Sequence, residues 1–148
     1  MIWYPHITVA TIVEQEGKFL IVEELDDGQI VFNQPAGHLE INESLIAAAV
    51  RETLEETGWL VEPTHIVDIS LYTSGKNDIT YFRTSFAAKA LEQVPGATLD
   101  EGIIQPRWLT LDELKSGLFS LRSPMVTYVI ERYLSGIKYP LDLVTYHG

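Results

Sequence analysis

The chain has 148 residues, 46% of them hydrophobic and 10% aromatic, which predicts one folded domain spanning residues 1–148 rather than a disordered chain. Its 21 Asp and Glu residues outnumber its 10 Lys and Arg residues, and the formal net charge of −11 argues against long nucleic acid or an anionic membrane as a partner. The longest apolar run, Leu45–Val50, is too short to span a bilayer, and the absence of cysteine excludes disulfides and thiolate chemistry. The first residues do not resemble a signal peptide, and the lack of cysteine leaves the redox compartment open, so a cytoplasmic location is expected only by default.

The first third of the chain has the pattern of a β-sheet. His6–Val13 is rich in Ile, Val and Thr, and Phe19–Val22 is a short apolar run. Ile30–Phe32 resumes the pattern after a turn. Pro35 and Gly37 are expected to end the sheet there, because proline lacks a backbone donor and glycine weakens a strand.

The most regular helical pattern covers Ser44–Thr57. Asn42 or Ser44 is suited to the N-cap, and Gly58 is suited to ending the helix. We expect Ala48–Ala49 to lie on the acidic side of this helix, where small side chains leave room for an approaching group. The opposite side is expected to pack on the sheet through Ile46, Val50 and Leu54.

The second half alternates between strands and short helices. Ile66–Tyr72 and Ile79–Ala88 flank the polar turn Ser74–Asp78, which predicts a hairpin. After a loop over about 92–102, Pro106–Leu109 is expected to form the last strand. This mixture of hairpins and helices predicts an α/β or α+β sandwich with a mixed sheet.

Two helices are predicted near the end of the chain. Thr110 and Glu113 have the spacing of a capping box for a short helix. Ser123 is suited to cap the final helix, with Pro124 at its first position. The stripe expected to face the core is Val126, Val129, Ile130, Tyr133 and Leu134.

Three carboxylates share one face of the helix over residues 44–57. Glu52, Glu55 and Glu56 are spaced at i, i+3 and i+4, where like charges repel, and they lie near the helix C-terminus, where the macrodipole disfavours anions. A solvated acidic face is the ordinary explanation for such a cluster. The other explanation is a divalent cation such as Mg²⁺, which prefers oxygen ligands and commonly bridges carboxylates to substrate phosphates.

Fixed spacing around these glutamates favours the second explanation. The positions concerned are Gly37, Glu43, Arg51, Glu52, Glu55, Glu56, Gly58 and Trp59. They match the Nudix box, G-x5-E-x7-R-E-U-x-E-E-x-G-U with U apolar, so the chain resembles the Nudix hydrolases. Thr53 departs from the usual apolar residue of the box. Four flanking segments further resemble the bacterial NudJ-type phosphatases, namely Asn33–Glu40, Arg107–Leu109, Leu121–Pro124 and Lys138–Leu141.

The resemblance implies an α/β fold, the Nudix-type α/β/α sandwich with a mixed β-sheet, and a metal-dependent catalytic site. Carried onto this chain, the ligands of Mg²⁺ or Mn²⁺ would be Glu52, Glu55, Glu56 and the carbonyl group of Ala36. Arg51 would brace the site by pairing with Glu43, since an unpaired buried charge is costly. It could instead be an ordinary i,i+4 partner of Glu55.

The family uses either the first box carboxylate or an acid from a later loop as the general base. Glu52 is the first of these, and the loop offers Asp100 and Glu101, of which Glu101 is preferred for its position ahead of Trp108. A solvated loop acid is the alternative explanation for Glu101.

Substrate contacts are harder to place. Many Nudix enzymes carry a basic residue after the second strand, where this chain has Glu23 and Glu24. Arg83 and Lys18 are therefore candidates for gripping a phosphate, as are Lys76 and Arg122, although surface charges are common. Phe32 is a candidate for stacking on a base, as are Trp3, Tyr4 and Tyr81, although core packing is equally open to an aromatic residue.

The expected activity is metal-dependent hydrolysis of phosphoanhydride bonds in nucleoside tri- and diphosphates and related small pyrophosphates, hydroxymethylpyrimidine pyrophosphate among them. The alternatives are a Nudix specificity for ADP-ribose or dinucleoside polyphosphates, or a non-catalytic Nudix module that binds a nucleotide. Retention of all four box glutamates favours an enzyme. Either a monomer or a homodimer is compatible with the sequence.

Overall fold

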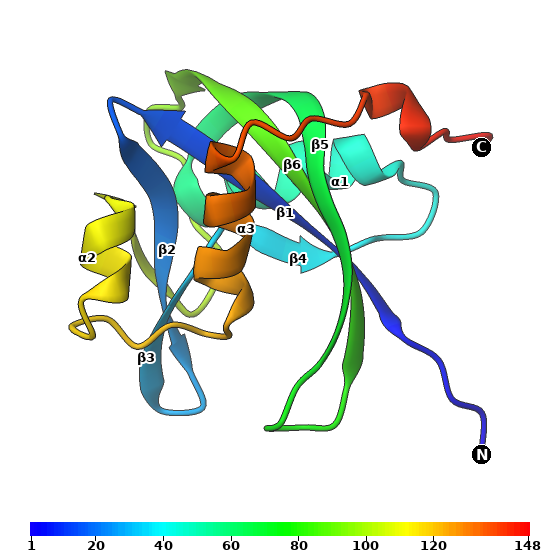
Figure 1. Ribbon diagram of the computed structural model, residues 1–148, viewed down its shortest axis with the longest axis horizontal. Helices are drawn as coiled ribbons and strands as arrows, with labels where there is room; N and C mark the ends of the chain where they lie inside the picture. The colour runs from blue at the N-terminus through cyan, green and yellow to red at the C-terminus, as the bar shows by residue number, and fades with distance from the viewer.

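The computed structural model describes residues 1–148, which form a mixed β-sheet with helices on both faces (Figure 1). The strands are β1 (His6–Gln15), β2 (Lys18–Asp26), β3 (Gln29–Asn33), β4 (Ala36–His38), β5 (Trp59–Thr73), β6 (Thr80–Gln93) and β7 (Ile103–Leu109). The helices are α1 (Leu45–Thr57), α2 (Leu111–Lys115) and α3 (Met125–Leu134), followed by a 3₁₀ turn at Leu141–Leu143. None of these helices is long and apolar enough to cross a membrane.

The sheet has the strand order β3-β2-β1-β6-β5, in which β1 and β6 are parallel and every other pair is antiparallel. Strand β1 pairs with β2 only at its end, through Glu14 and Gln15. Its first half pairs instead with β4, where Gly37 lies opposite Val9. Strand β4 thereby lies beside β1 and carries Gly37, the first residue of the Nudix-like motif, which continues into α1.

Alternate residues of β5 and β6 face two separate cores. On β5 and β6, Ile66 and Phe86 pack with α1, whereas their neighbours Val67 and Ala87 pack with α3. Because neighbouring residues of a strand point to opposite faces, α1 and α3 cover opposite sides of the sheet. Figure 1 shows α3 in front of the sheet and α1 behind it. The predicted α/β/α arrangement with a mixed sheet is confirmed.

Two strand boundaries differ from the prediction. Pro35 does not end the sheet, because β4 forms immediately after it. Strand β5 begins at Trp59, seven residues before the predicted Ile66, and continues through Pro63. Proline is tolerated there because β5 is an edge strand with register irregularities on both sides of that residue.

The predicted helix ends are confirmed where a side chain or glycine defines them. The Ser44 hydroxyl accepts a hydrogen bond from the Ala47 amide at 3.0 Å, and Gly58 ends α1 with a φ of 75°. Thr110 and Glu113 form the predicted capping box of α2. Helix α3 is the exception, because Pro124 is its N-cap rather than its first helical residue and no side-chain hydrogen bond caps the helix; the Ser123 hydroxyl still accepts from the Met125 amide.

The sheet-facing side of α1 is not the one the sequence suggested. Ala48 and Ala49 are fully buried against the sheet, whereas the apolar ridge of Ile46, Val50 and Leu54 is only half-buried. Small residues allow the helix backbone to approach the sheet closely, which places the larger side chains along the margins of the contact. Leu134 was also expected in the core, but it is 51% exposed at the last position of α3.

Thr53, the departure from the usual box pattern, is part of this close contact. Its side chain is fully buried. Its hydroxyl bonds to the Thr11 hydroxyl of β1 at 2.8 Å and donates to the Ala49 carbonyl at 2.7 Å. A buried hydroxyl with both partners carries no desolvation penalty, so the departure leaves the packing of α1 on the sheet intact.

Candidate active site

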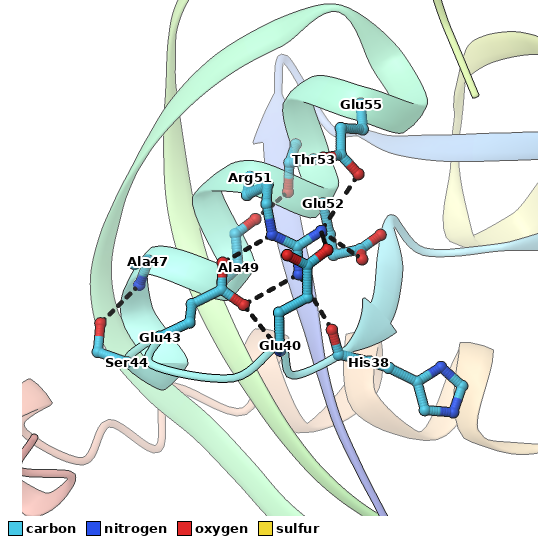
Figure 2. Close-up of polar contacts among 10 residues, drawn as sticks. All are labelled: His38, Glu40, Glu43, Ser44, Ala47, Ala49, Arg51, Glu52, Thr53 and Glu55. Atoms are coloured by element: carbon cyan, nitrogen blue, oxygen red, sulfur yellow. Dashed lines mark hydrogen bonds and ion pairs between the residues drawn. The ribbon is translucent and has the colours of Figure 1, made fainter. Parts of the chain in front are cut away.

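Arg51 is the centre of the polar network at the C-terminal half of α1 (Figure 2). Its Nε and Nη2 donate to the two carboxylate oxygens of Glu43 at 2.6 and 3.0 Å. Its Nη1 donates to Glu52 at 2.8 Å and to Glu55 at 3.2 Å, and Nη2 also donates to the His38 carbonyl. The bidentate bond to Glu43 raises the pKa of Arg51 above its usual range and lowers the pKa of Glu43. Both interpretations of Arg51, brace and i,i+4 partner, describe contacts that exist.

Negative charge around Arg51 exceeds what one guanidinium can neutralise. Glu40 also lies 3.3 Å from Nη1, so four carboxylates contact this single arginine. Carboxylate oxygens of Glu52, Glu55 and Asp100 additionally lie within 4.8 Å of one another. A divalent cation is the kind of ligand that such a set of hard oxygen donors fits.

The loop before β7 delivers Asp100 to this group, and its neighbour Glu101 does not join it. The Asp100 amide donates to the Glu55 carbonyl at 3.0 Å, and the Val94 amide donates to the Gly58 carbonyl at 2.8 Å, so the loop is fastened to the end of α1. Glu101 is exposed in the following turn. Both acids were candidates from the sequence, but only the backbone hydrogen bonds of this loop show that Asp100 is the one that reaches the carboxylates.

Gly37 lets the backbone of β4 pass directly beside the Glu52 carboxylate. A Cβ atom built at Gly37 would overlap all three carboxyl atoms of Glu52. No side chain larger than hydrogen can therefore occupy position 37 while Glu52 keeps its place. The box glycine sets the position of a box glutamate.

We expect the substitution Gly37→Ala to lower kcat/KM at least about tenfold with a small change in melting temperature, because the added methyl group displaces Glu52 from a site that tolerates little misplacement. Steady-state kinetics and thermal unfolding measure the two effects. Gly75→Ala is the matched control, since a Cβ there meets nothing within 4 Å. Equal activity in the two variants would contradict this role of Gly37.

Glu56 differs from the other box glutamates in its burial. One of its oxygens accepts a hydrogen bond from the Ala36 amide at 2.9 Å, which links α1 to the start of β4. Burial nevertheless raises the pKa of Glu56 to about 8 and raises the pKa of Glu52 in the same direction. In the absence of a metal ion, Glu56 therefore retains its proton near neutral pH.

This protonation predicts a pH dependence for the metal-free protein. Between pH 6.5 and about 8, folded Glu56 holds a proton that the unfolded chain has released, so the free energy of unfolding falls as the pH rises. Burial lowers the pKa of His38 and His65, so these two groups oppose the trend close to the ordinary histidine pKa of 6.5, and the fall is clearest toward pH 8. Denaturant unfolding in EDTA measures the trend. A stability that rises over this range, or an unchanged slope in Glu56→Gln, would contradict it.

A cavity of about 430 Å³ opens beside these carboxylates. Glu52 and Glu56 line it from α1, and Ala36, Gly37 and His38 line it from β4. Its remaining walls come from the β2–β3 hairpin, the β5–β6 hairpin and the segment leading into α3. This volume is within the range of ligand-binding pockets in general.

Arg83 lines the same cavity from β6 and is 8% exposed. Its Nη2 donates to the Gln34 side chain at 3.0 Å, and Gln34 in turn donates to the Val126 carbonyl at 2.7 Å. The Nε of Arg83 has no hydrogen-bond partner, and burial lowers the pKa of the guanidinium to about 10. The charge of Asp68 offsets only part of this cost, and a buried cation with an unpaired Nε that faces a cavity is typical of a site for an anionic group.

Two other sequence candidates for substrate contact lie elsewhere. Phe32 is 7% exposed and packs in the core beneath α3, with its ring 4.9 Å from that of Phe119. Lys18 is exposed at the start of β2, and it does not line the cavity. Of the sequence candidates for substrate contact, Arg83, Lys76, Arg122 and Tyr81 line the carboxylates' cavity, whereas Phe32, Lys18, Trp3 and Tyr4 do not.

Comparison with known proteins agrees with this geometry. A family model described as the NUDIX domain matches residues 4–128. The chain belongs to the Nudix family. Phosphatase NudJ of Escherichia coli (strain K12) is 43% identical over 141 residues, which cover 95% of this chain and 90% of that protein.

Solved structures place this Nudix hydrolase among its relatives. A NUDIX hydrolase from Nitrosomonas europaea is 41% identical and aligns with a TM-score of 0.94 over 97% of this chain and 98% of that one. An ADP-ribose pyrophosphatase from Streptococcus suis, 20% identical, aligns with a TM-score of 0.68 over 93% of this chain and 96% of that one, and shares the fold. The predicted resemblance to Nudix hydrolases of the NudJ type is confirmed.

Proposed function

We propose that this Nudix hydrolase uses Mg²⁺ or Mn²⁺ to cleave phosphoanhydride bonds in nucleoside tri- and diphosphates and related small pyrophosphates. The observation that carries the proposal is the presence of both carboxylates and a cation in one cavity. Glu52, Glu56 and the buried Arg83 all line it. A pyrophosphate group is an anion that Arg83 can bind directly, and a divalent cation held by the glutamates would offset its negative charge beside them.

The residues that would hold the ion are Glu52, Glu55, Glu56 and the carbonyl group of Ala36. Their hard oxygen donors fit Mg²⁺ or Mn²⁺, and Glu52 belongs both to the carboxylate group with Asp100 and to the cavity lining. When bound, a divalent ion lowers the pKa of a coordinated water and offsets negative charge on the phosphoryl oxygens.

The protein's own groups divide the remaining work. Arg51 and Glu43 hold Glu52 and Glu55 in place through the network described above. Arg83 lines the same cavity, where it binds a phosphate oxygen and orients the anhydride. Asp100, in place of Glu101, is the loop carboxylate that accepts a proton from the attacking water, since its oxygen lies close to those of Glu52 and Glu55.

The test follows substrate loss and product formation by anion-exchange chromatography for a panel of substrates with Mg²⁺, with and without EDTA. The panel contains a nucleoside triphosphate, a nucleoside diphosphate, hydroxymethylpyrimidine pyrophosphate and ADP-ribose. We expect turnover of the first three, which EDTA abolishes. Turnover that persists in EDTA would contradict the metal dependence, and turnover of ADP-ribose alone would contradict the proposed substrate class.

A further inference from the structure

The β5–β6 hairpin extends beyond the body of the molecule as an arm whose two faces differ (Figure 1). Tyr72 and Tyr81 lie directly opposite each other on its two strands, and both line the cavity. Leu71 and Phe82, the next pair along, point to the other face and are 68% and 36% exposed. The arm thus turns its tyrosines toward the cavity and its apolar residues away from it.

The residues that line the cavity differ in chemical type between the base and the tip of the arm. Arg83, two residues beyond Tyr81, lies at the base, level with Ser70. The two tyrosines come next, and Ser74 and Asn77 line the cavity nearest the tip. A ligand with its anionic group on Arg83 therefore has aromatic side chains beside whatever that group is attached to.

Tyr81 is held in place without being packed into a core. Its hydroxyl accepts a hydrogen bond from the side-chain amide of Asn77 at 3.2 Å. The His6 ring lies edge-on to the Tyr81 ring, with the two ring centroids 5.7 Å apart. Both tyrosines are only half-buried and belong to none of the three hydrophobic clusters. An aromatic side chain fixed beside a cavity but not buried presents a surface on which a flat ring can stack.

The opposite wall does not favour a second anionic group. Glu24 and Asp26 line the cavity from the β2–β3 hairpin. Glu24 lies 2.6 Å from Arg122, and Asp26 lies 3.9 Å from Lys76 at the tip of the β5–β6 arm. The cations near the mouth are already paired, so the space between the hairpins suits an uncharged group better than another phosphate.

We propose that Tyr72 and Tyr81 bind an uncharged planar ring attached to the pyrophosphate, and that this arm selects ring-bearing substrates over bare polyphosphates. The inference rests on the proposed function, because it takes Arg83 and the glutamates as the binding site of the pyrophosphate. The inference adds that the substrate carries a planar ring, and it names the two tyrosines that recognise this ring.

The experiment compares KM for ATP with KM for inorganic tripolyphosphate, which has the anhydride but no ring, in wild type, Tyr81→Ala and Tyr81→Phe. We expect the ratio of KM for ATP to KM for tripolyphosphate to rise at least about tenfold in Tyr81→Ala, since stacking on an aromatic side chain contributes that much to the binding of one base. Tyr81→Phe, which keeps the ring, restores most of the wild-type ratio. Leu71→Ala, on the outer face of the same arm, is the matched control and keeps the wild-type ratio.

Binding of a non-hydrolysable ATP analogue, measured by equilibrium dialysis, separates this inference from the proposed function. Wild type that binds the analogue but cleaves neither probe would overturn the proposed function, and the loss of analogue affinity in Tyr81→Ala would still support the ring site. An unchanged KM ratio and an unchanged analogue affinity in Tyr81→Ala would overturn the ring site and leave the hydrolase standing. The ring site would also be overturned if Tyr81→Ala raised KM equally for ATP and tripolyphosphate, or if the wild-type protein bound no ATP analogue.

Discussion

Replacing Glu56 with glutamine is expected to lower turnover at least about a hundredfold while leaving the metal-free protein as stable as wild type or more so. Glutamine keeps the oxygen that accepts from the Ala36 amide, so the link between α1 and β4 is preserved. The substitution removes a carboxylate that would coordinate the ion. It also removes the cost of ionising a buried acid whose pKa burial has raised to about 8.

Phosphate-release kinetics and thermal unfolding in EDTA at pH 8 measure the two effects together. Glu62→Gln is the matched control, because Glu62 is an exposed glutamate of β5 outside the cavity. A Glu56 variant with near-wild-type turnover would remove Glu56 from the metal site. A variant that loses turnover only because it unfolds would leave its catalytic role unsupported.

The substitution Asp100→Asn is expected to lower kcat at least about a hundredfold with a smaller effect on KM, because the asparagine amide cannot accept the proton of the attacking water. The Asp100 backbone amide still bonds to the Glu55 carbonyl in this variant, so the loop keeps its position. Steady-state kinetics with saturating Mg²⁺ measure the effect.

Glu101→Gln is the internal control for Asp100, since the two acids are adjacent and only Asp100 has its carboxylate among those of the cluster. We expect this variant to retain most of the wild-type kcat. The reverse result, with loss of activity in Glu101→Gln and retention in Asp100→Asn, would restore the assignment that the sequence order favoured.

Local signals in the sequence predict much of this fold correctly. The caps of α1 depend on the Ser44 hydroxyl and on Gly58, whose effects do not extend beyond one helical turn. The capping box at Thr110 and Glu113 is equally local. The Arg51–Glu55 pair was also predictable, because it has the i,i+4 spacing of a helix, whereas Glu43 and the His38 carbonyl reach Arg51 from the segment before α1.

Tertiary contacts decide what the sequence could not. Periodicity predicts an apolar ridge on α1, but the sheet packs against Ala48 and Ala49. Their small side chains let the helix backbone approach the sheet more closely than larger side chains would. Strand β4 depends on pairing with β1, which no local pattern around Gly37 indicates. Phe32 and Arg83 were both candidates for substrate contact. Only the structure shows that Phe32 is packed under α3 and that Arg83 lines the cavity.

The arrangement of charge on α1 has a cost that a purely structural helix would not carry. Like charges at i, i+3 and i+4 repel one another, and the helix macrodipole disfavours them at this end. Arg51 relieves part of that repulsion by contacting Glu52 and Glu55, but it does not contact Glu56. Charges that destabilise a helix locally without any structural gain are typical of a functional site.

A titration with Mn²⁺, followed by the electron paramagnetic resonance signal of the free ion, tests most directly whether these glutamates form a metal centre. Wild type is expected to deplete the free-ion signal, and Glu55→Gln and Glu56→Gln are each expected to weaken Mn²⁺ binding at least about tenfold. Identical titration curves for wild type and both variants would contradict the account, because the glutamates would then not be what holds the ion.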